Sequence, residues 1–244
     1  MNSINRKISL VLILAAVALT ISCDDDEQQV SPLKGQLIGF VRLYDEEGVE
    51  IFDRSNVKVT ANENHSTLTD QGGRFEFTNI EAGNYIFQYE KEGFGAYKQF
   101  NVQFAAGNKP GVISNIRLIQ LPGIEITRVD AQVTGDRTIS ISGELEEVDS
   151  YTLVYYVNDS SNVSNIKFDY SSSSSFCCFP VTRFADQIYL HDDLFHYGQK
   201  VYVAIYAASK GNGNSAFSYY DYANRKYVNP AVKKLTNPIE LILN

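Results

Sequence analysis

Short runs of alternating apolar and polar residues, separated by turn-forming residues, are the feature that most constrains how this chain can fold. Phe75 and Phe77, for example, alternate with Arg74 and Glu76. A period of two places the apolar side chains on one face of a β-strand. Because no long stretch keeps the period of an α-helix, the pattern predicts an all-β protein built from short strands.

The first half of the chain is predicted to form a β-sandwich. Its expected strands are Gln36–Tyr44, Asn56–Ala61, Ser66–Thr69, Arg74–Thr78, Asn84–Glu90, Lys98–Phe104 and Val112–Leu121. Asp70 and the Gln-Gly-Gly after it are typical of a tight hairpin turn, because an Asp side chain can bond the backbone of its own turn. Six apolar residues are expected in the core: Val57, Val59, Phe75, Phe77, Tyr85 and Phe87.

Several motifs in this half carry a family resemblance. Thr69–Ile80 reads TDQGGRFEFTNI and Glu81–Phe87 reads EAGNYIF, with shorter matches at Gly39–Val41, Asn56–Thr60 and Gly93-Phe94. Together they resemble the carboxypeptidase regulatory-like family over residues 35–121. The resemblance implies a transthyretin-like sandwich that acts as a non-catalytic spacer, stabiliser or docking unit in an exported protein.

A second sandwich is expected over residues 122–244, because Leu121-Pro122-Gly123 interrupts the pattern before a new series of runs begins. Its expected strands are Ile124–Val133, Thr138–Leu145, Tyr151–Val157, Asn165–Tyr170, Gln187–Leu190 and Lys200–Ala208. For the last strand, Ile239–Leu243 is preferred to Phe217–Tyr222. This choice leaves Asn212–Pro238 as a long, tyrosine-rich connection, and connections of such length are uncommon unless they are functional or disordered.

The strand ending this series has a family likeness of its own. Gly198–Ser209 reads GQKVYVAIYAAS and resembles the sixth strand of fibronectin type III domains, while Ile139–Ser142 and Tyr151–Tyr155 are similar to the second and third strands of that family. The resemblance implies an immunoglobulin-like sandwich. The predicted organisation is therefore two tandem sandwiches, the second of them fibronectin type III-like or immunoglobulin-like.

The N-terminus has the pattern of an export signal. Arg6 and Lys7 precede an apolar run that is too short to span a bilayer, which favours a signal peptide over residues 1–22. The run ends in Leu19-Thr20-Ile21-Ser22-Cys23, which resembles the lipobox of bacterial lipoproteins. That resemblance implies cleavage before Cys23 and attachment of lipid to it, which would anchor the protein to a membrane through its acyl chains.

An acidic run follows the cysteine. It consists of Asp24, Asp25, Asp26 and Glu27. With the residues up to 34 it reads as a solvated tether, because like charges repel and extend a chain. The run also resembles the signal by which Bacteroidota-type bacteria export lipoproteins to the outer leaflet of the outer membrane. We therefore expect an exported, outer-membrane lipoprotein that is exposed at the cell surface.

The charge balance narrows the function classes. The chain has 244 residues with a formal net charge of −8, and nucleic-acid binding needs clustered Lys and Arg instead. No sequence motif of a hydrolase, metalloprotease or nucleotide-binding loop is present. We expect no enzymatic activity, no cofactor and no metal site.

Two segments are candidates for binding. The first is Phe176-Cys177-Cys178-Phe179, which follows five serines that read as a flexible loop. Outside the cytoplasm Cys177 and Cys178 are expected to oxidise, so they could form a vicinal disulfide, link to another chain or remain as reduced thiols packed under the loop. A tip with two Phe residues would offer a compact apolar contact surface.

The second candidate is the tyrosine-rich C-terminal segment, in which Tyr219, Tyr220, Tyr222 and Tyr227 could form a platform for sugar rings. The alternative is that these tyrosines are ordinary residues on the wet face of a strand. The leading hypothesis is a surface module that binds a glycan or a protein. The other is a structural subunit that contacts other envelope proteins through its strand edges.

Overall fold

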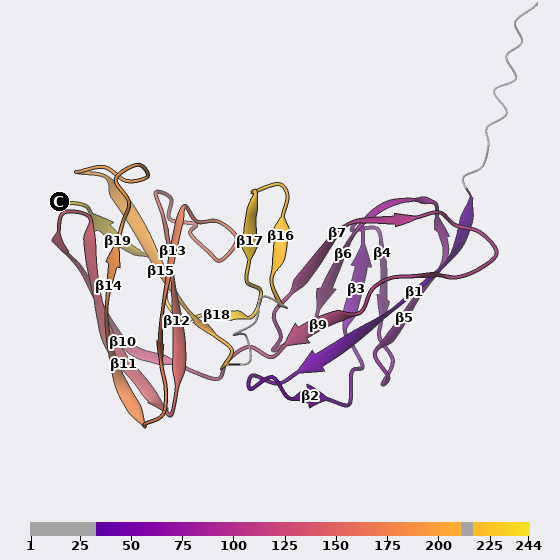
Figure 1. The fold of residues 1–244 in the computed structure, drawn as a ribbon, viewed down its shortest axis with the longest axis horizontal. Coiled ribbons are helices and arrows are strands. Elements are labelled where there is room, and N and C mark those ends of the chain that lie inside the picture. Colours follow the sequence, from indigo (N-terminus) through magenta and orange to yellow (C-terminus); the bar gives the residue numbers. More distant parts are fainter. Residues whose placement is uncertain (1–32, 211–216) are drawn as a thin grey trace, which may run out of the picture. The chain divides into compact units, whose positions relative to one another are not determined.

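The computed structural model of the chain describes residues 33–210 and 217–244 (Figure 1). These ranges contain strands and no α-helix, and no helix in them is long and apolar enough to cross a membrane. The expected signal peptide, Cys23 and the acidic run Asp24–Glu27 lie outside the described residues.

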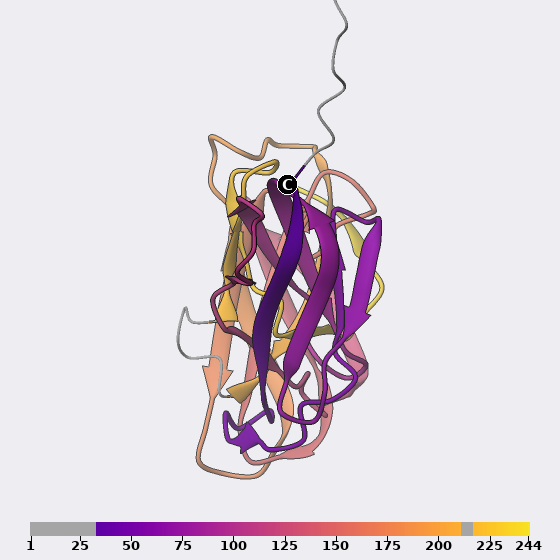
Figure 2. The ribbon, with the colours of Figure 1, turned by 90° about the vertical axis from the view of Figure 1, so that its right-hand side faces the viewer.

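The first sandwich consists of two sheets. One has β1 (Lys34–Tyr44) at its centre, between β2 (Glu50–Ile51) and β5 (Arg74–Glu81), with β8 (Gly111–Val112) and β9 (Ile116–Ile119) also paired to β1 (Figure 2). The other sheet has the order β4-β3-β6-β7. Its strands are β4 (His65–Leu68), β3 (Lys58–Ala61), β6 (Gly83–Glu90) and β7 (Tyr97–Phe104).

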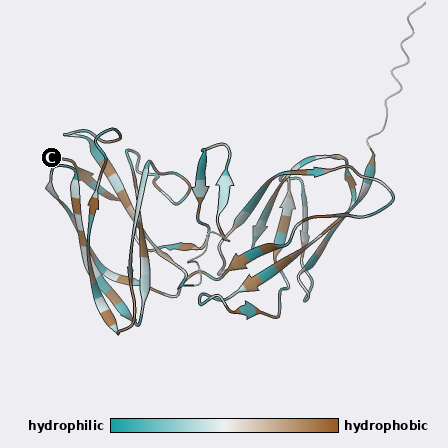
Figure 3. Cartoon of the chain, in the orientation of Figure 1, coloured by the Kyte–Doolittle hydropathy of each residue, from teal (hydrophilic) through white to brown (hydrophobic). Residues whose placement is uncertain are grey.

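Alternation explains the core between these sheets. All six residues expected there are buried, and Phe75 and Phe77 from β5 meet Phe87 and Tyr89 from β6 in the same cluster. Figure 3 shows hydrophobic and hydrophilic residues alternating along the strands. Asp70 forms the expected turn, since its Oδ1 accepts a hydrogen bond of 2.9 Å from the backbone N–H of Arg74.

The second sandwich has a three-stranded sheet of order β10-β11-β14. These strands are β10 (Ile126–Gly135), β11 (Thr138–Val148) and β14 (Val181–Tyr189). The opposite sheet has the order β13-β12-β15-β18, with β19 also paired to β15. Its strands are β13 (Tyr170–Phe176), β12 (Tyr151–Asn158), β15 (Lys200–Ala208), β18 (Val232–Lys234) and β19 (Ile239–Ile242).

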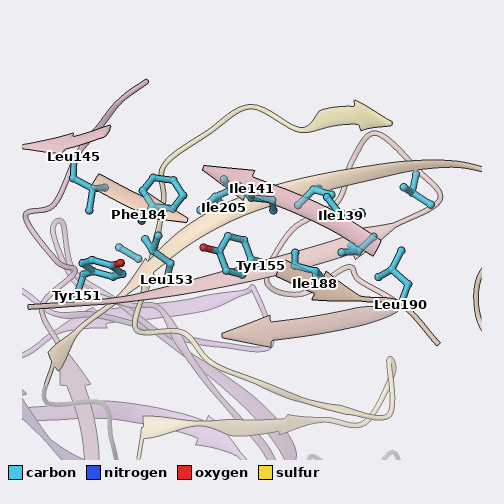
Figure 4. Close-up of a cluster of buried hydrophobic side chains, with 14 of the residues drawn as sticks. Ile139, Ile141, Leu145, Tyr151, Leu153, Tyr155, Phe184, Ile188, Leu190 and Ile205 are labelled. Atoms are coloured by element: carbon cyan, nitrogen blue, oxygen red, sulfur yellow. The ribbon is translucent and has the colours of Figure 1, made fainter. Parts of the chain in front are cut away.

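A carboxyl group lies beside the core of this sandwich. Figure 4 shows Ile139 and Ile141 of β11 among the buried side chains, with Tyr155 of β12 beside them. Asp186 of β14 pairs in register with Ile141, and its Oδ2 accepts a hydrogen bond from the Tyr155 hydroxyl. Burial, that hydrogen bond and the charge of Asp186 all raise the pKa of Tyr155, so the hydroxyl stays protonated and available as a donor.

Two predictions for this half, one of a loop and one of a strand, were wrong. The five serines do not form a flexible loop, because Ser171–Ser175 belong to β13 and pair with β12 over their full length. Strand pairing uses backbone groups, so a run of serines can supply it at a sheet edge. The strand predicted at Asn165–Tyr170 is absent except for its last residue, which begins β13, since Ser164 and Lys167 exchange backbone hydrogen bonds of 2.9 and 3.1 Å that close a turn. The expected last strand at Ile239–Leu243 is present as β19.

The tyrosine-rich connection contains a hairpin formed by β16 (Tyr219–Asp221) and β17 (Lys226–Val228), as Figure 1 shows. Residues before and after this hairpin bury apolar surface against the first sandwich. Phe217 and Ala231 form a buried cluster with Ile119, and the partly buried Tyr44 packs against it. The hairpin is therefore held at its base by both halves of the polypeptide, which lie in one compact unit, Leu33–Asn244.

Candidate functional site

The base of the hairpin is a buried aromatic contact. Tyr219 is only 8% exposed, and its ring lies 5.3 Å from that of Tyr97 and 6.1 Å from that of Phe100, both on β7. Burial, followed by the nearby Asp221 and Tyr97, raises the pKa of Tyr219 to about 12, so this hydroxyl is uncharged at neutral pH. Tyr219 therefore supports the hairpin, and it is removed from the predicted set of ligand-contacting residues.

The exposed rings continue outward from that base. Tyr222 meets Phe100 edge-on at 5.8 Å, Tyr220 lies 5.1 Å from Tyr222, and Tyr227 lies 5.1 Å from Tyr220. Tyr222 is 60% exposed and Tyr227 is 74% exposed. We name these four residues, Phe100, Tyr220, Tyr222 and Tyr227, the aromatic hairpin surface. Three of them are among the residues predicted to bind a ligand.

Two sets of contacts fix the hairpin in place. Asp221 accepts hydrogen bonds from the backbone N–H groups of Ala223 and Asn224 at 2.9 and 3.2 Å, and from Asn224 Nδ2 at 2.8 Å. On the other strand, the Lys226 ammonium donates to the carbonyl oxygen of Phe168 and lies 4.2 Å above the centre of its ring. These contacts give the exposed rings a preset position, which reduces the entropy lost on binding.

A hollow of about 230 Å³ lies on the outer face of the β4-β3-β6-β7 sheet, beside Phe100. The residues that line it are Thr60, Asn62, Glu63, Ile86, Gln88, Lys98 and Phe100. The side chains of Lys98 and Glu63 make no hydrogen bond or ion pair within the described part of the chain. Phe100 joins the hollow to the exposed rings, so one continuous surface combines aromatic faces with available polar groups.

The charge of Lys98 also acts on the hairpin. Burial raises the pKa of Asp221, but the hydrogen bonds from Asn224 and Ala223, together with the charge of Lys98, outweigh it and leave this pKa below its usual range. Asp221 is therefore an anion at neutral pH. Its charge lies near the ammonium of Lys98 without forming a short ion pair.

The other predicted binding segment lies elsewhere. Phe179 is 70% exposed, and Phe176 stacks on Tyr151 with ring centres 5.8 Å apart. The sulfur atoms of Cys177 and Cys178 are joined in a vicinal disulfide, and Cys178 donates its backbone N–H to the carbonyl of Asp149. Among the described residues no ring contact joins this tip to the aromatic hairpin surface, so the sequence candidates form two separate sites.

A wider hollow covers the outer face of the β10-β11-β14 sheet, with a volume of about 590 Å³. Apart from Ile141, the residues that line it are short or polar, including Asp130, Gln132, Ser140, Ser142 and Gln187, and no aromatic ring is among them. A polar outer face is what a solvated sheet needs in any case. The aromatic hairpin surface is the stronger candidate because it adds exposed rings that solvation does not require.

Metal binding finds no support in the described residues, where no group of three His, Cys, Asp or Glu residues could hold an ion. Neither the hollow beside Phe100 nor the hollow on the β10-β11-β14 sheet was predicted from the sequence. Thr60, Gln88 and Lys98 meet only through strand pairing, in which Gln88 lies between the other two.

Comparisons with known proteins give no family. No family model matches the chain, and no curated protein matches it. Solved structures with a similar arrangement include a candidate carbohydrate-binding protein from Bacteroides uniformis, with 15% identity and a TM-score of 0.38 over 86% of this chain and 100% of that chain.

Two further solved structures are DUF3823 family proteins. The one from Bacteroides ovatus has 12% identity and a TM-score of 0.37 over 86% of this chain and 100% of its own. The one from Parabacteroides merdae has 14% identity and a TM-score of 0.32 over 84% and 100%. These values are too low to transfer a function, so the functional argument depends on the surface itself.

Proposed function

We propose that this chain is a non-catalytic binding module and that the aromatic hairpin surface, with the adjoining hollow, binds an uncharged glycan. The observation that carries the proposal is the continuity of exposed rings with unpaired polar groups. Tyr222 and Tyr227 are solvent-exposed, and Phe100 connects them to Lys98 and Glu63. Binding sites usually combine a largely apolar surface with a few polar groups that fix the ligand's orientation.

The rings suit one face of a sugar. The C–H groups on one face of a pyranose are weakly apolar and pack on the face of an aromatic ring, while the hydroxyls at its rim need hydrogen-bond partners. Tyr222 supplies the first kind of contact and its own hydroxyl adds the second. An exposed tyrosine also loses little conformational entropy on binding, because it has only two side-chain torsions.

The charges around the hollow favour a neutral ligand. Lys98 supplies one positive charge and Glu63 one negative charge, and neither is paired within the described residues. A polyanionic or polycationic chain would meet one like charge for each opposite one. Hydroxyl groups can accept from the ammonium and donate to the carboxylate.

The same hollow argues for binding without cleavage. Glycoside hydrolysis in most families uses two carboxyl groups, one on each side of the bond that breaks. Among the described residues that line the hollow, Glu63 is the single carboxylate. We infer that a bound glycan is held and not hydrolysed.

The test is the affinity of the purified protein for neutral soluble polysaccharides, measured by affinity electrophoresis and then by calorimetry on the best binder. Tyr222→Ala is expected to weaken binding about 10- to 100-fold, because it removes an exposed ring together with its apolar area and its stacking on the sugar. Tyr197→Ala is the matched control, since Tyr197 is 81% exposed and makes no ring contact with the aromatic hairpin surface.

The outcomes separate the alternatives. Equal weakening in Tyr197→Ala and Tyr222→Ala would show that the effect is not specific to the site. Weaker binding in Phe179→Ala but not in Tyr222→Ala would move the site to the Cys177-Cys178 tip. If no neutral polysaccharide binds and the protein is folded, the glycan proposal is wrong.

We further propose that Cys23 carries the membrane anchor and that Asp24–Glu27 direct the protein to the cell surface. The support is the sequence pattern alone, because these residues lie outside the described ranges. Cys23→Ala should release the protein from membranes after carbonate washing. Replacing Asp24–Glu27 with Ala should protect the protein from protease added to intact cells, and digestion of both the native and the altered protein would contradict the role of the acidic run.

A further inference from the structure

One edge strand of the second sandwich lacks the features that usually prevent an edge strand from pairing with another chain. Among the described strands, β13 lies at the end of its sheet and pairs with β12 alone. Apart from that ladder, no backbone hydrogen bond within the described residues involves Ser171–Ser175. Half of the backbone N–H and C=O groups along this strand therefore face outward and can pair with another strand.

The other edges of this sandwich carry charge. Among them, β10 has Arg128 and Asp130, and β18 has Lys233 and Lys234. Edge strands with charges of this kind resist pairing with a second chain, since pairing would bury or crowd those charges. Each of these edges is therefore poorly suited to strand addition.

On the edge strand β14, an inward-pointing acidic residue disfavours pairing with a second chain. Asp186 faces the interior, where the Tyr155 hydroxyl donates to it. By contrast, no Asp, Glu, Lys or Arg occurs from Tyr170 to Thr182, although the chain as a whole has a net charge of −8. A second copy of this acidic chain meets the least repulsion at this edge.

The sequence of β13 has the same residue types when read in either direction. The strand has an aromatic residue at each end, Tyr170 and Phe176, and five serines between them. Tyr170 pairs with Val157 and Phe176 pairs with Tyr151, both of which are core residues of β12, so the two aromatic side chains lie on the same face. Ser173 is the central residue.

We propose that two copies of this chain associate through β13, antiparallel and centred on Ser173. In that register Tyr170 of one copy lies opposite Phe176 of the partner at both ends of the paired strands, and serines lie opposite serines between them. Aromatic pairs directly across two strands stabilise a sheet, and small hydroxyl side chains can bond one another. An arrangement with the same patch on both copies is the commonest kind of oligomer. The proposal is independent of glycan binding.

The first experiment measures the mass of the purified full chain by sedimentation equilibrium. We expect a species of twice the monomer mass at tens of micromolar. Ser173→Lys places two ammonium groups opposite each other at the centre and is expected to raise the dissociation constant at least 10-fold. Thr127→Lys adds the same charge at an exposed position on β10 and should leave the association unchanged.

The second experiment tests the register. In a protein with Cys23, Cys177 and Cys178 changed to Ser, Ser173→Cys should give a disulfide-linked dimer under mild oxidation, because residues directly opposite in antiparallel strands have Cα atoms about 4.5–5.5 Å apart. Ser171→Cys should not, because the two copies of residue 171 would lie about 13 Å apart, four residue spacings along the strand.

Three results would overturn the proposal. A wild-type chain that stays monomeric at every concentration would show that the β13 edge does not pair with a second copy, and an extended segment of another protein would then be the occupant to test. Association that Ser173→Lys and Thr127→Lys affect equally would place the interface elsewhere. Cross-linking through Ser171→Cys as efficient as through Ser173→Cys would show a different register.

Discussion

Asp221 holds the turn of the aromatic hairpin with both of its carboxylate oxygens. One oxygen accepts two backbone N–H groups, and the other accepts the side-chain amide of Asn224. These bonds fix the turn that begins at Tyr222, so the exposed ring depends on a neighbouring carboxylate for its position. A single residue thus links the local geometry of a four-residue turn to the proposed binding surface.

Asp221→Ala should lower the free energy of unfolding by about 0.5–1 kcal/mol, because the hydrogen bonds are removed at a half-exposed group that solvent screens. Asp221→Asn keeps an acceptor for the turn and should retain most of that stability. Urea unfolding of the three proteins at pH 7 measures the difference. An Asn variant as unstable as the Ala variant would show that charge, and not the turn bonds, is the stabilising factor.

The effect has a pH window set by the lowered pKa of Asp221. The stabilisation is present above the unfolded-state value of about 3.9 and is lost as the pH falls through the lower folded-state value. The stability gap between the wild type and Asp221→Ala should therefore narrow only below about pH 4. A gap that already closes near pH 6 would assign the effect to another group.

The sequence could identify some residues of the candidate site and not others. Tyr220, Tyr222 and Tyr227 are conspicuous because aromatic residues cluster in one segment. Phe100, Lys98 and Glu63 carry no such signal. Phe100 and Lys98 join the site through pairing of β7 and packing against a hairpin more than a hundred residues away in sequence, and Glu63 joins it from the turn between β3 and β4. Tyr219 has the same composition signal as its neighbours, and only its packing on β7 shows that it is buried.

At the scale of strands, β11 lies very close to both β10 and β14 at Gly143. A Cβ atom added at Gly143 would lie 2.4 Å from the carbonyl oxygen of Arg128 and 2.6 Å from the ring of Phe184. The first of these contacts is with backbone, so a rotamer change cannot relieve it. Gly143 is therefore required for the three strands to pack at this point.

Gly143→Ala should lower the free energy of unfolding by about 1–3 kcal/mol, the usual cost of overpacking a core. Gly135→Ala is the control, because its nearest atoms would lie at an ordinary 3.7 Å and Ala is favoured over Gly in a strand. Thermal unfolding followed by circular dichroism compares the two. A Gly143→Ala protein as stable as Gly135→Ala would mean that β10 can shift without cost.

The elements themselves follow largely from alternation. Strands such as β5 and β15 were predictable because each has apolar residues on one face at a period of two. The serine strand β13 was not, since serine neither favours a strand nor marks a buried face. Its place in the sheet comes from the backbone groups of β12, which need partners along the edge.

For the whole molecule, Gly95 and Pro230 bring residues of the two halves into close contact. A Cβ atom added at Gly95 would lie 2.3 Å from the carbonyl oxygen of Pro230. Close by, Ser209 is buried, and its hydroxyl donates to the carbonyl of Gln120 at 2.5 Å. The two sandwiches therefore share a hydrogen bond from a buried residue and apolar surface, and we expect them to unfold together.

Gly95→Ala should separate that cooperative unfolding into two heat-absorption peaks in differential scanning calorimetry, because the backbone of Pro230 must move away. Gly83→Ala, whose nearest atom would lie at 3.6 Å, should keep the single peak. Two peaks in the wild-type protein would contradict the coupling. One unshifted peak in Gly95→Ala would show that the contact near Pro230 adds little.

Because the hairpin β16–β17 lies beside the first sandwich but is encoded in the second half of the gene, it limits how the two halves can be recombined in evolution. The rings of Tyr220 and Tyr222 are encoded far downstream of the hollow that they adjoin, and residues 121–124 lie between the two. A genetic exchange that joined either half to an unrelated neighbour at that point would transmit a folded sandwich with only part of the surface. The two halves can keep a common specificity only if they are exchanged as a unit.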